Sequence, residues 1–119
     1  MSAFQPFLAS EYPMAAVDEA FFHVIPVPLE KSVSYGTGTR NGPAAILEAS
    51  QQLEAWENGC FPGRQGIYTA PFLNCAKDIE EVLEEIEQRV DAALARDACP
   101  VLLGGEHTVT LGALRSFAK

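Results

Sequence analysis

The most informative run in the chain is Val101-Leu102-Leu103-Gly104-Gly105-Glu106-His107-Thr108. Its three apolar residues follow Pro100 and have the length of a short buried strand. The two glycines then allow the backbone to turn sharply and to approach its neighbours closely. Residues 108–117 have the pattern of a short helix. We therefore expect a strand, a tight turn and a helix in this part of the chain.

The segment just before this run predicts the clearest helix of the sequence. Eight acidic and three basic residues lie between Lys77 and Asp97, a net charge of 3 − 8 = −5, and we interpret them as the solvated face of that helix. The apolar residues recur at helical spacing and would form one buried stripe, namely Ile79, Val82, Leu83, Ile86, Val90 and Leu94.

Two further strands and one further helix are predicted nearer the N-terminus. Phe21–Ile25 is an aromatic and β-branched run that Pro26 and Pro28 would end, and Gly66–Thr69 is a weaker strand. Gly42-Pro43 would start a helix, because proline is tolerated at the first helical position. Its expected buried face is Ile46, Ala49, Leu53 and Trp56, and its expected stop is Asn58-Gly59.

The resulting order, β-α-β-α-β-α, predicts an α/β fold in which helices cover both faces of a parallel sheet in three layers. Residues 21–119 would form this portion. Residues 1–20 would be an irregular N-terminal arm, since Pro6 and Pro13 disfavour long regular elements. The arm would pack through its apolar residues Phe4, Phe7, Leu8, Tyr12 and Met14.

Composition limits the classes of function. The chain has 119 residues and a net charge of 8 − 16 = −8, which argues against nucleic acid and anionic membranes as partners. It has no apolar stretch near the roughly 20 residues that span a bilayer, and Met1–Pro13 lacks the features of a signal peptide. We therefore expect a cytoplasmic protein. Its three cysteines form no C-x-x-C pair, which favours reduced thiols, with Cys99 in the core.

Two segments would lie at the carboxyl ends of the strands, where open parallel sheets bind ligands. One is the Ser32–Pro43 loop and the other is Gly104–Thr108. The second would present His107 where a metal could use it, with Thr108 capping the next helix. The alternative is that His107 is only a satisfied polar residue beside a turn. Because one histidine and one acid cannot hold a catalytic metal, spacing alone favours this second interpretation without excluding the first.

Other candidate groups carry weaker signals. The Ser32–Pro43 loop contains Gly36 and Gly38, but its third glycine, Gly42, falls one position too late for the phosphate-binding pattern G-x-G-x-x-G. No Walker pattern is present either. The loop is more typical of a lid or a subsite loop. Arg40 could bind an anion, although a structural tether is the more frequent role of such an arginine. We expect His23 to be a hydrogen-bonded core histidine. No Ser-His-Asp or Cys-His arrangement is evident.

Two separated motifs resemble those of the ureohydrolases, the family of arginase, agmatinase and formiminoglutamase. Leu103–Thr108 is similar to that family's L-G-G-[DE]-H-[ST] segment, and Gly38–Ser50 is similar to its G-x-R-x-G-P-x-x-I-R-x-A-S segment. The resemblance runs from about Phe21 to the end of the chain and is closest to the agmatinases. Glu106, where the family also uses Asp, is within its range.

The resemblance implies a metal centre to which this sequence contributes only some of the residues. His107 would be one ligand of a centre of two Mn²⁺ ions, supported by Glu106, Gly104 and Gly105 without their touching the metal. A metal-bridging hydroxide would attack a small guanidino substrate and release urea, with agmatine giving putrescine. The remaining ligands lie in the family on later D-x-H-x-D and D-x-D runs, which this sequence does not contain.

We therefore expect the N-terminal part of an agmatinase-like hydrolase, inactive by itself, with no catalytic residue of its own and with substrate-binding residues that cannot be named. Val101–Leu103 would be an unpaired apolar edge strand, which favours a homo-oligomer. Two alternatives remain at this point. The chain could be a stand-alone, non-catalytic binding or assembly module, or its Gly36–Gly42 loop could bind a nucleotide.

Overall fold

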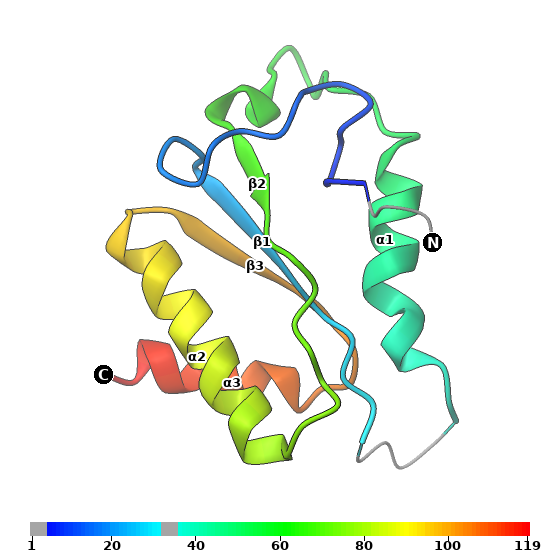
Figure 1. Cartoon of the computed structure of the whole chain (residues 1–119). Helices are drawn as coiled ribbons and strands as arrows, with labels where there is room; N and C mark the ends of the chain where they lie inside the picture. The colour runs from blue at the N-terminus through cyan, green and yellow to red at the C-terminus, as the bar shows by residue number, and fades with distance from the viewer. Residues whose placement is uncertain (1–4, 32–35) are drawn as a thin grey trace.

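A three-stranded parallel sheet forms the centre of the molecule (Figure 1). The structure is a computed structural model that describes residues 5–31 and 36–119, so Phe4 and the Ser32–Tyr35 part of the predicted loop lie outside the described residues. The strands are β1 (Phe22–Val27), β2 (Ile67–Thr69) and β3 (Cys99–Gly104), in the order β2-β1-β3. The predicted parallel sheet is confirmed.

The two ladders of β1 differ in length. β1 and β3 are paired along six positions, from Phe22 opposite Cys99 to Val27 opposite Gly104. β1 and β2 are paired at only three, from Phe22 opposite Ile67 onward. Within the described part of the chain β3 pairs with β1 alone, so it is an edge strand, as its apolar sequence and the family resemblance suggested.

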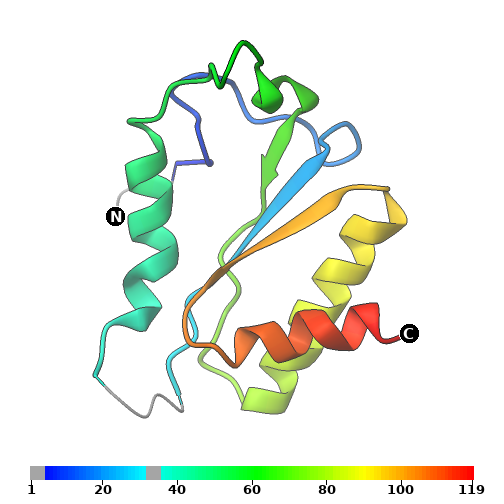
Figure 2. The same cartoon turned by 180° about the vertical axis from the view of Figure 1, so that it is seen from behind.

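Helices cover both faces of the sheet. α1 (Gly42–Ser50) lies on one face, and α2 (Ile79–Ala95) and α3 (Val109–Phe117) lie together on the other (Figures 1 and 2). Two short 3₁₀ turns, Thr39–Asn41 and Pro62–Gln65, precede α1 and β2. Among the described residues no helix is both long enough and apolar enough to cross a bilayer. The predicted three layers are therefore present.

The core is split by the sheet into a larger and a smaller cluster. The smaller one, on the α1 side, is Val24, Leu47 and Leu103. The larger one lies on the α2 side and contains the predicted helical stripe, with Val82, Ile86 and Val90 fully buried. Its members are Ile25, Val27, Leu29, Leu73, Val82, Leu83, Ile86, Val90 and Val109.

Pro26 does not end the first strand, contrary to prediction. β1 continues to Val27, and Pro26 stays paired with Leu103 of β3. Its carbonyl accepts a hydrogen bond of 3.0 Å from Leu73 N, beyond the end of β2. A proline is tolerated there because its missing N–H faces the side on which the β2 ladder has already stopped.

The prediction for α1 is wrong in length and in face. The helix ends at Ser50, and Ile46, Leu53 and Trp56 are exposed. Its buried side is instead Pro43, Leu47 and Ser50. Asn58 and Gly59 lie well beyond the end of the helix and have positive φ angles of 47° and 82°. They form the turn of a small antiparallel bridge between Glu57 and Cys60, not a helix stop.

The N-terminal arm is tied to the sheet and to α1 by its backbone. Phe7 N donates to Thr69 Oγ1 and Leu8 N to Ser50 Oγ, each at 2.9 Å. Leu8 is buried, whereas Met14, predicted to pack, is 46% exposed. Buried polar groups at the ends of β2 and α1 thus hold the arm.

His23 is a core histidine, as predicted. It is buried, and its Nε2 lies 3.0 Å from the carbonyl oxygen of Val17. Burial lowers the pKa of its imidazole, a shift that the bond to Val17 partly offsets. The three cysteines are free thiols, and Cys99, expected in the core, is half-buried at the start of β3.

Candidate functional site

Three segments that are far apart in the sequence meet where β1 and β3 end. They are residues 28–31 after β1, residues 38–42 before and at the start of α1, and residues 104–108 after β3. Gly105 has φ +61°, and a Cβ there would lie 2.4 Å from the carbonyl oxygen of Val27. Only glycine fits such an approach. The structure therefore brings together the two segments that the sequence placed at the carboxyl edge.

Glu106 fastens the turn after β3 to the segment after β1. It is 5% exposed, and its backbone N–H donates to the carbonyl of Leu29 at 2.9 Å. Its carboxylate accepts from the backbone N–H of Lys31 and, at 2.8 Å, from the hydroxyl of Thr108. Thr108 occupies the N-cap position of α3 but makes no capping bond there, so the predicted side-chain cap is wrong.

His107 stands between Glu106 and Thr108 and is exposed. Its backbone carbonyl accepts from Thr110 N at 3.0 Å in the first turn of α3. No hydrogen bond to its ring is found in residues 5–31 and 36–119. Among the described residues the side chain therefore lies at the surface and is not a buried polar group.

Glu30 is the central group of the site, and no motif or spacing in the sequence predicted it. Its Oε1 accepts from Gly38 N at 2.8 Å, from Arg40 N at 3.1 Å and from Thr39 Oγ1 at 3.2 Å. The backbone donors of Arg40 and then of Gly38 are the main causes that hold the pKa of this carboxyl below its ordinary value. A single glutamate in a turn has no pattern of spacing, so only the contact across the loop reveals it.

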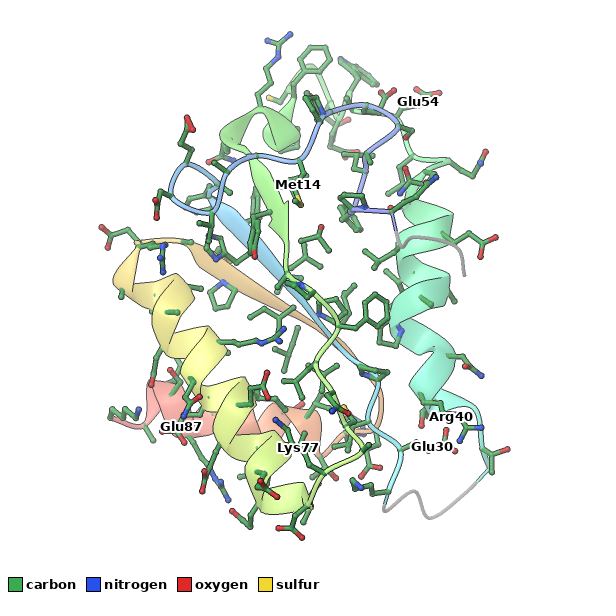
Figure 3. All side chains as sticks on the ribbon, viewed as in Figure 1. Met14, Glu30, Arg40, Glu54, Lys77 and Glu87 are labelled. Atoms are coloured by element: carbon green, nitrogen blue, oxygen red, sulfur yellow. The ribbon has the colours of Figure 1, made fainter. Side chains whose placement is uncertain are left out.

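Arg40 forms an ion pair with Glu30, with Nη1 3.5 Å from Oε2 (Figure 3). This contact supports the tether interpretation of Arg40. The same carboxylate argues against the alternative of nucleotide binding. A phosphate in this loop would need hydrogen bonds from the backbone amides of Gly38 and Arg40. Both already donate to a carboxylate, which disfavours an anion at this loop.

A shallow hollow of about 500 Å³ lies beside this cluster, between the segment after β1 and the segment after β2. Lys31, Arg40 and Asn41 line one side, and Asn74 and Cys75 line the other. Burial raises the pKa of the Cys75 thiol, so it is not an activated nucleophile.

The described residues do not form a complete metal site. Within residues 5–31 and 36–119 no three His, Cys, Asp or Glu side chains are grouped so that they could hold an ion. At the described part of the carboxyl edge His107 is exposed, whereas the carboxylates of Glu30 and Glu106 accept from backbone amides. A lone imidazole does not hold a catalytic Mn²⁺.

Comparisons with known proteins agree with this arrangement. The Arginase family model matches residues 20–119. The chain is 35% identical to the N(1)-aminopropylagmatine ureohydrolase of Synechocystis sp. over 95% of its own length and 39% of that protein.

Two solved structures are also similar. The agmatine ureohydrolase of Thermoplasma volcanium superimposes with a TM-score of 0.85 at 28% identity, over 98% of this chain and 39% of that one. The Trypanosoma cruzi formiminoglutamase with Mn²⁺ gives 0.82 at 25% identity, over 93% and 39%. The chain thus spans about two fifths of the length of these proteins and corresponds to their N-terminal part. With both motifs in contact and a family match over most of its length, the chain belongs to the arginase family.

Proposed function

We propose that the chain is the N-terminal part of a manganese-dependent ureohydrolase that cleaves a guanidino C–N bond and releases urea. Agmatine is the proposed substrate and putrescine the second product. Family membership supports the reaction class. The names of the Synechocystis and Thermoplasma proteins, which refer to agmatine and a derivative of it, support the substrate.

The observation that carries the proposal is the presentation of His107. Its exposed ring stands at the carboxyl end of β3, on a turn that Glu106 fastens to the segment after β1. We propose His107 as one manganese ligand, and the presence of Mn²⁺ in the Trypanosoma structure supports this choice of metal. Manganese would supply a Lewis acid and an activated water. The other ligands would come from outside the matched two fifths of the fold, so residues 1–119 alone would be inactive.

The decisive experiment joins residues 1–119 to the part of the Synechocystis enzyme that lies outside the matched region. We expect Mn²⁺-dependent release of urea from agmatine by this chimera. Removing a residue that hydrogen-bonds a metal ligand lowers activity by up to about 100-fold. Because His107→Asn replaces a proposed ligand itself, it should lower the rate by more than that. Glu48→Gln, an exposed change on α1, should leave the rate unaltered.

Two results would contradict the proposal. A chimera that unfolds cooperatively, and therefore is folded, but releases no urea from agmatine or N(1)-aminopropylagmatine would refute the activity. Release of urea by residues 1–119 alone would refute the shared site.

We also propose that the chain associates with further copies of itself. β3 has one unpaired edge within the described residues, and unpaired edges are templates for strand addition. On α3, which follows β3, three apolar side chains spaced three residues apart are exposed: Leu111 by 45%, Leu114 by 57% and Phe117 by 60%. The unpaired edge of β3 and the exposed apolar stripe of α3 lie on consecutive elements. Together they form a surface on which a second copy of the chain could dock.

A further inference from the structure

We propose that Glu30 is a positioning residue that fixes the turn carrying His107 by holding the segment Gly38–Arg40 against it. The inference rests on the proposed function, because His107 is the proposed ligand. It concerns a residue 77 positions away in the sequence, which neither motif contains.

The first link joins Glu30 to the loop. Its carboxylate accepts from two backbone amides, Gly38 N and Arg40 N, and from the hydroxyl of Thr39 between them. Three consecutive residues are thus bound to one side chain, only 8% of which is exposed. Bonds from amides to an ionised carboxylate are stronger than bonds between neutral groups. The conformation of the loop segment therefore depends on this one carboxylate.

The second link joins the loop to the turn. The carbonyl of Thr39 accepts from Gly105 N at 3.4 Å, and Gly42 packs against the carbonyl of Gly104. Gly104 and Gly105 are the residues that redirect the chain from β3 toward His107. If residues 38–40 move, the bond from Gly105 to Thr39 is lost, and the turn is then held only by Glu106 and by the contact with Gly42 at the start of α1.

The backbone around Glu30 is itself immobilised. Leu29 O accepts from Glu106 N, and Lys31 N donates to the Glu106 carboxylate. Both neighbours of Glu30 are therefore bound to the residue that precedes His107. The two glutamates hold the turn from opposite sides, Glu106 directly and Glu30 through residues 38–40. The Oε1 of Glu30 accepts all three bonds from residues 38–40 and its Oε2 lies 3.5 Å from Arg40 Nη1, so the partners of its carboxylate among the described residues all belong to the loop segment that it holds.

The test uses residues 1–119 without metal or substrate and compares the wild type with Glu30→Ala and Glu30→Gln by NMR. In Glu30→Ala we expect the amides of Gly38 and Arg40 to exchange with solvent about tenfold faster or more, as the loss of charge-assisted bonds implies. The amide signal of Gly105 and the ring signals of His107 should shift in the same variant. Glu48→Gln, which removes a glutamate charge on the exposed side of α1, should move none of them.

The outcomes separate a positioning role from a merely structural one. Faster exchange at Gly38 and Arg40, with the Gly105 and His107 signals unmoved, would overturn the proposal, as would no change at any of these sites. If Glu30→Ala does not fold, Glu30→Gln decides by the same signals, because it keeps one acceptor oxygen and loses the charge. A failure of the chimera to release urea leaves these signals unaffected, so the two proposals fail independently.

Discussion

The α-carbon of Gly42 faces the carbonyl oxygen of Gly104 so closely that a Cβ on Gly42 would lie 2.7 Å from that oxygen. The φ of Gly42 is −59°, an ordinary helical value that any residue can adopt. Glycine is therefore required at the start of α1 by the approach of another backbone, not by its own dihedral angles. This contact joins the two motifs that identify the family.

Gly42→Ala should destabilise the fold although alanine is the better helix former. The clash is with a backbone oxygen, which cannot rotate away, and overpacking of this kind costs about 1–3 kcal/mol. The free energy of unfolding in urea measures the effect. Glu48→Ala on the same helix is the control and should change that free energy by less than about 0.5 kcal/mol. A Gly42→Ala protein as stable as the wild type would show that β3 and α1 separate easily.

Ser50→Ala should release the N-terminal arm. Ser50 is 2% exposed, and its hydroxyl accepts from Leu8 N. Its loss leaves a buried N–H without that partner, at a cost of about 1–3 kcal/mol. Ser10→Ala, an exposed serine on the arm itself, is the matched control. We expect proteolysis within residues 5–14 to become faster in Ser50→Ala only, and equal rates in the two variants would contradict the role of Ser50.

Stability should fall as the pH is lowered through the range in which His23 titrates. Burial lowers the pKa of His23 below 6.5 in the folded state, so the unfolded chain binds a proton more readily. The resulting stabilisation is complete above pH 6.5 and is lost as the pH falls toward the folded-state pKa. The carboxyls with lowered pKa, including Glu30 and Glu85, have ordinary values of 4.5 and lose their contributions only below that.

Urea unfolding at several pH values between about 7.5 and 5 measures this dependence. His23→Asn should flatten the curve across that interval, since it removes the titrating group. A variant with the same slope as the wild type would assign the dependence to other groups.

Much of the fold could be predicted because its strands and α2 carry their own patterns. The stripe from Ile79 to Leu94 has only one helical interpretation, whereas Ala44, Ala45, Ile46 and Leu47 are all apolar and leave the face of α1 undetermined. Packing against Val24 of β1 and Leu103 of β3, not the local sequence, decides that Leu47 is buried. The site was harder still: Glu106 lies within a motif, but Glu30 acquires its partners only when the loop closes.

Self-association should depend on the apolar stripe of α3. Leu114→Gln should reduce the concentration dependence of the sedimentation coefficient, because it places an amide in the proposed interface. Trp56→Gln is a matched control, since both side chains are 57% exposed and Trp56 lies outside α3 and β3. If the wild type sediments as a monomer at high concentration, the proposed association is wrong.

Mn²⁺ should not stabilise residues 1–119. A ligand raises the unfolding temperature clearly only when its concentration is well above its dissociation constant for the folded state. Residues 5–31 and 36–119 contain no group of donor side chains that could bind the ion so tightly. We expect the midpoint of thermal unfolding in about 100 µM Mn²⁺ to match that in EDTA to within about 1 °C. The chimera serves as the positive control and should melt higher with Mn²⁺. A clear rise for residues 1–119 alone would reveal a site that His107 does not explain.

The bond between Lys31 and Glu106 spans 75 positions of the sequence. Because β1 ends at Val27 and β3 at Gly104, the β1–β3 ladder already closes this loop, and the bond can form only once the ladder has brought its two ends together. The turn that bears His107 should therefore reach its final shape only after the β1–β3 ladder has formed. The proposed ligand would not be correctly oriented in an incompletely folded chain, and premature capture of a metal ion during synthesis would be disfavoured.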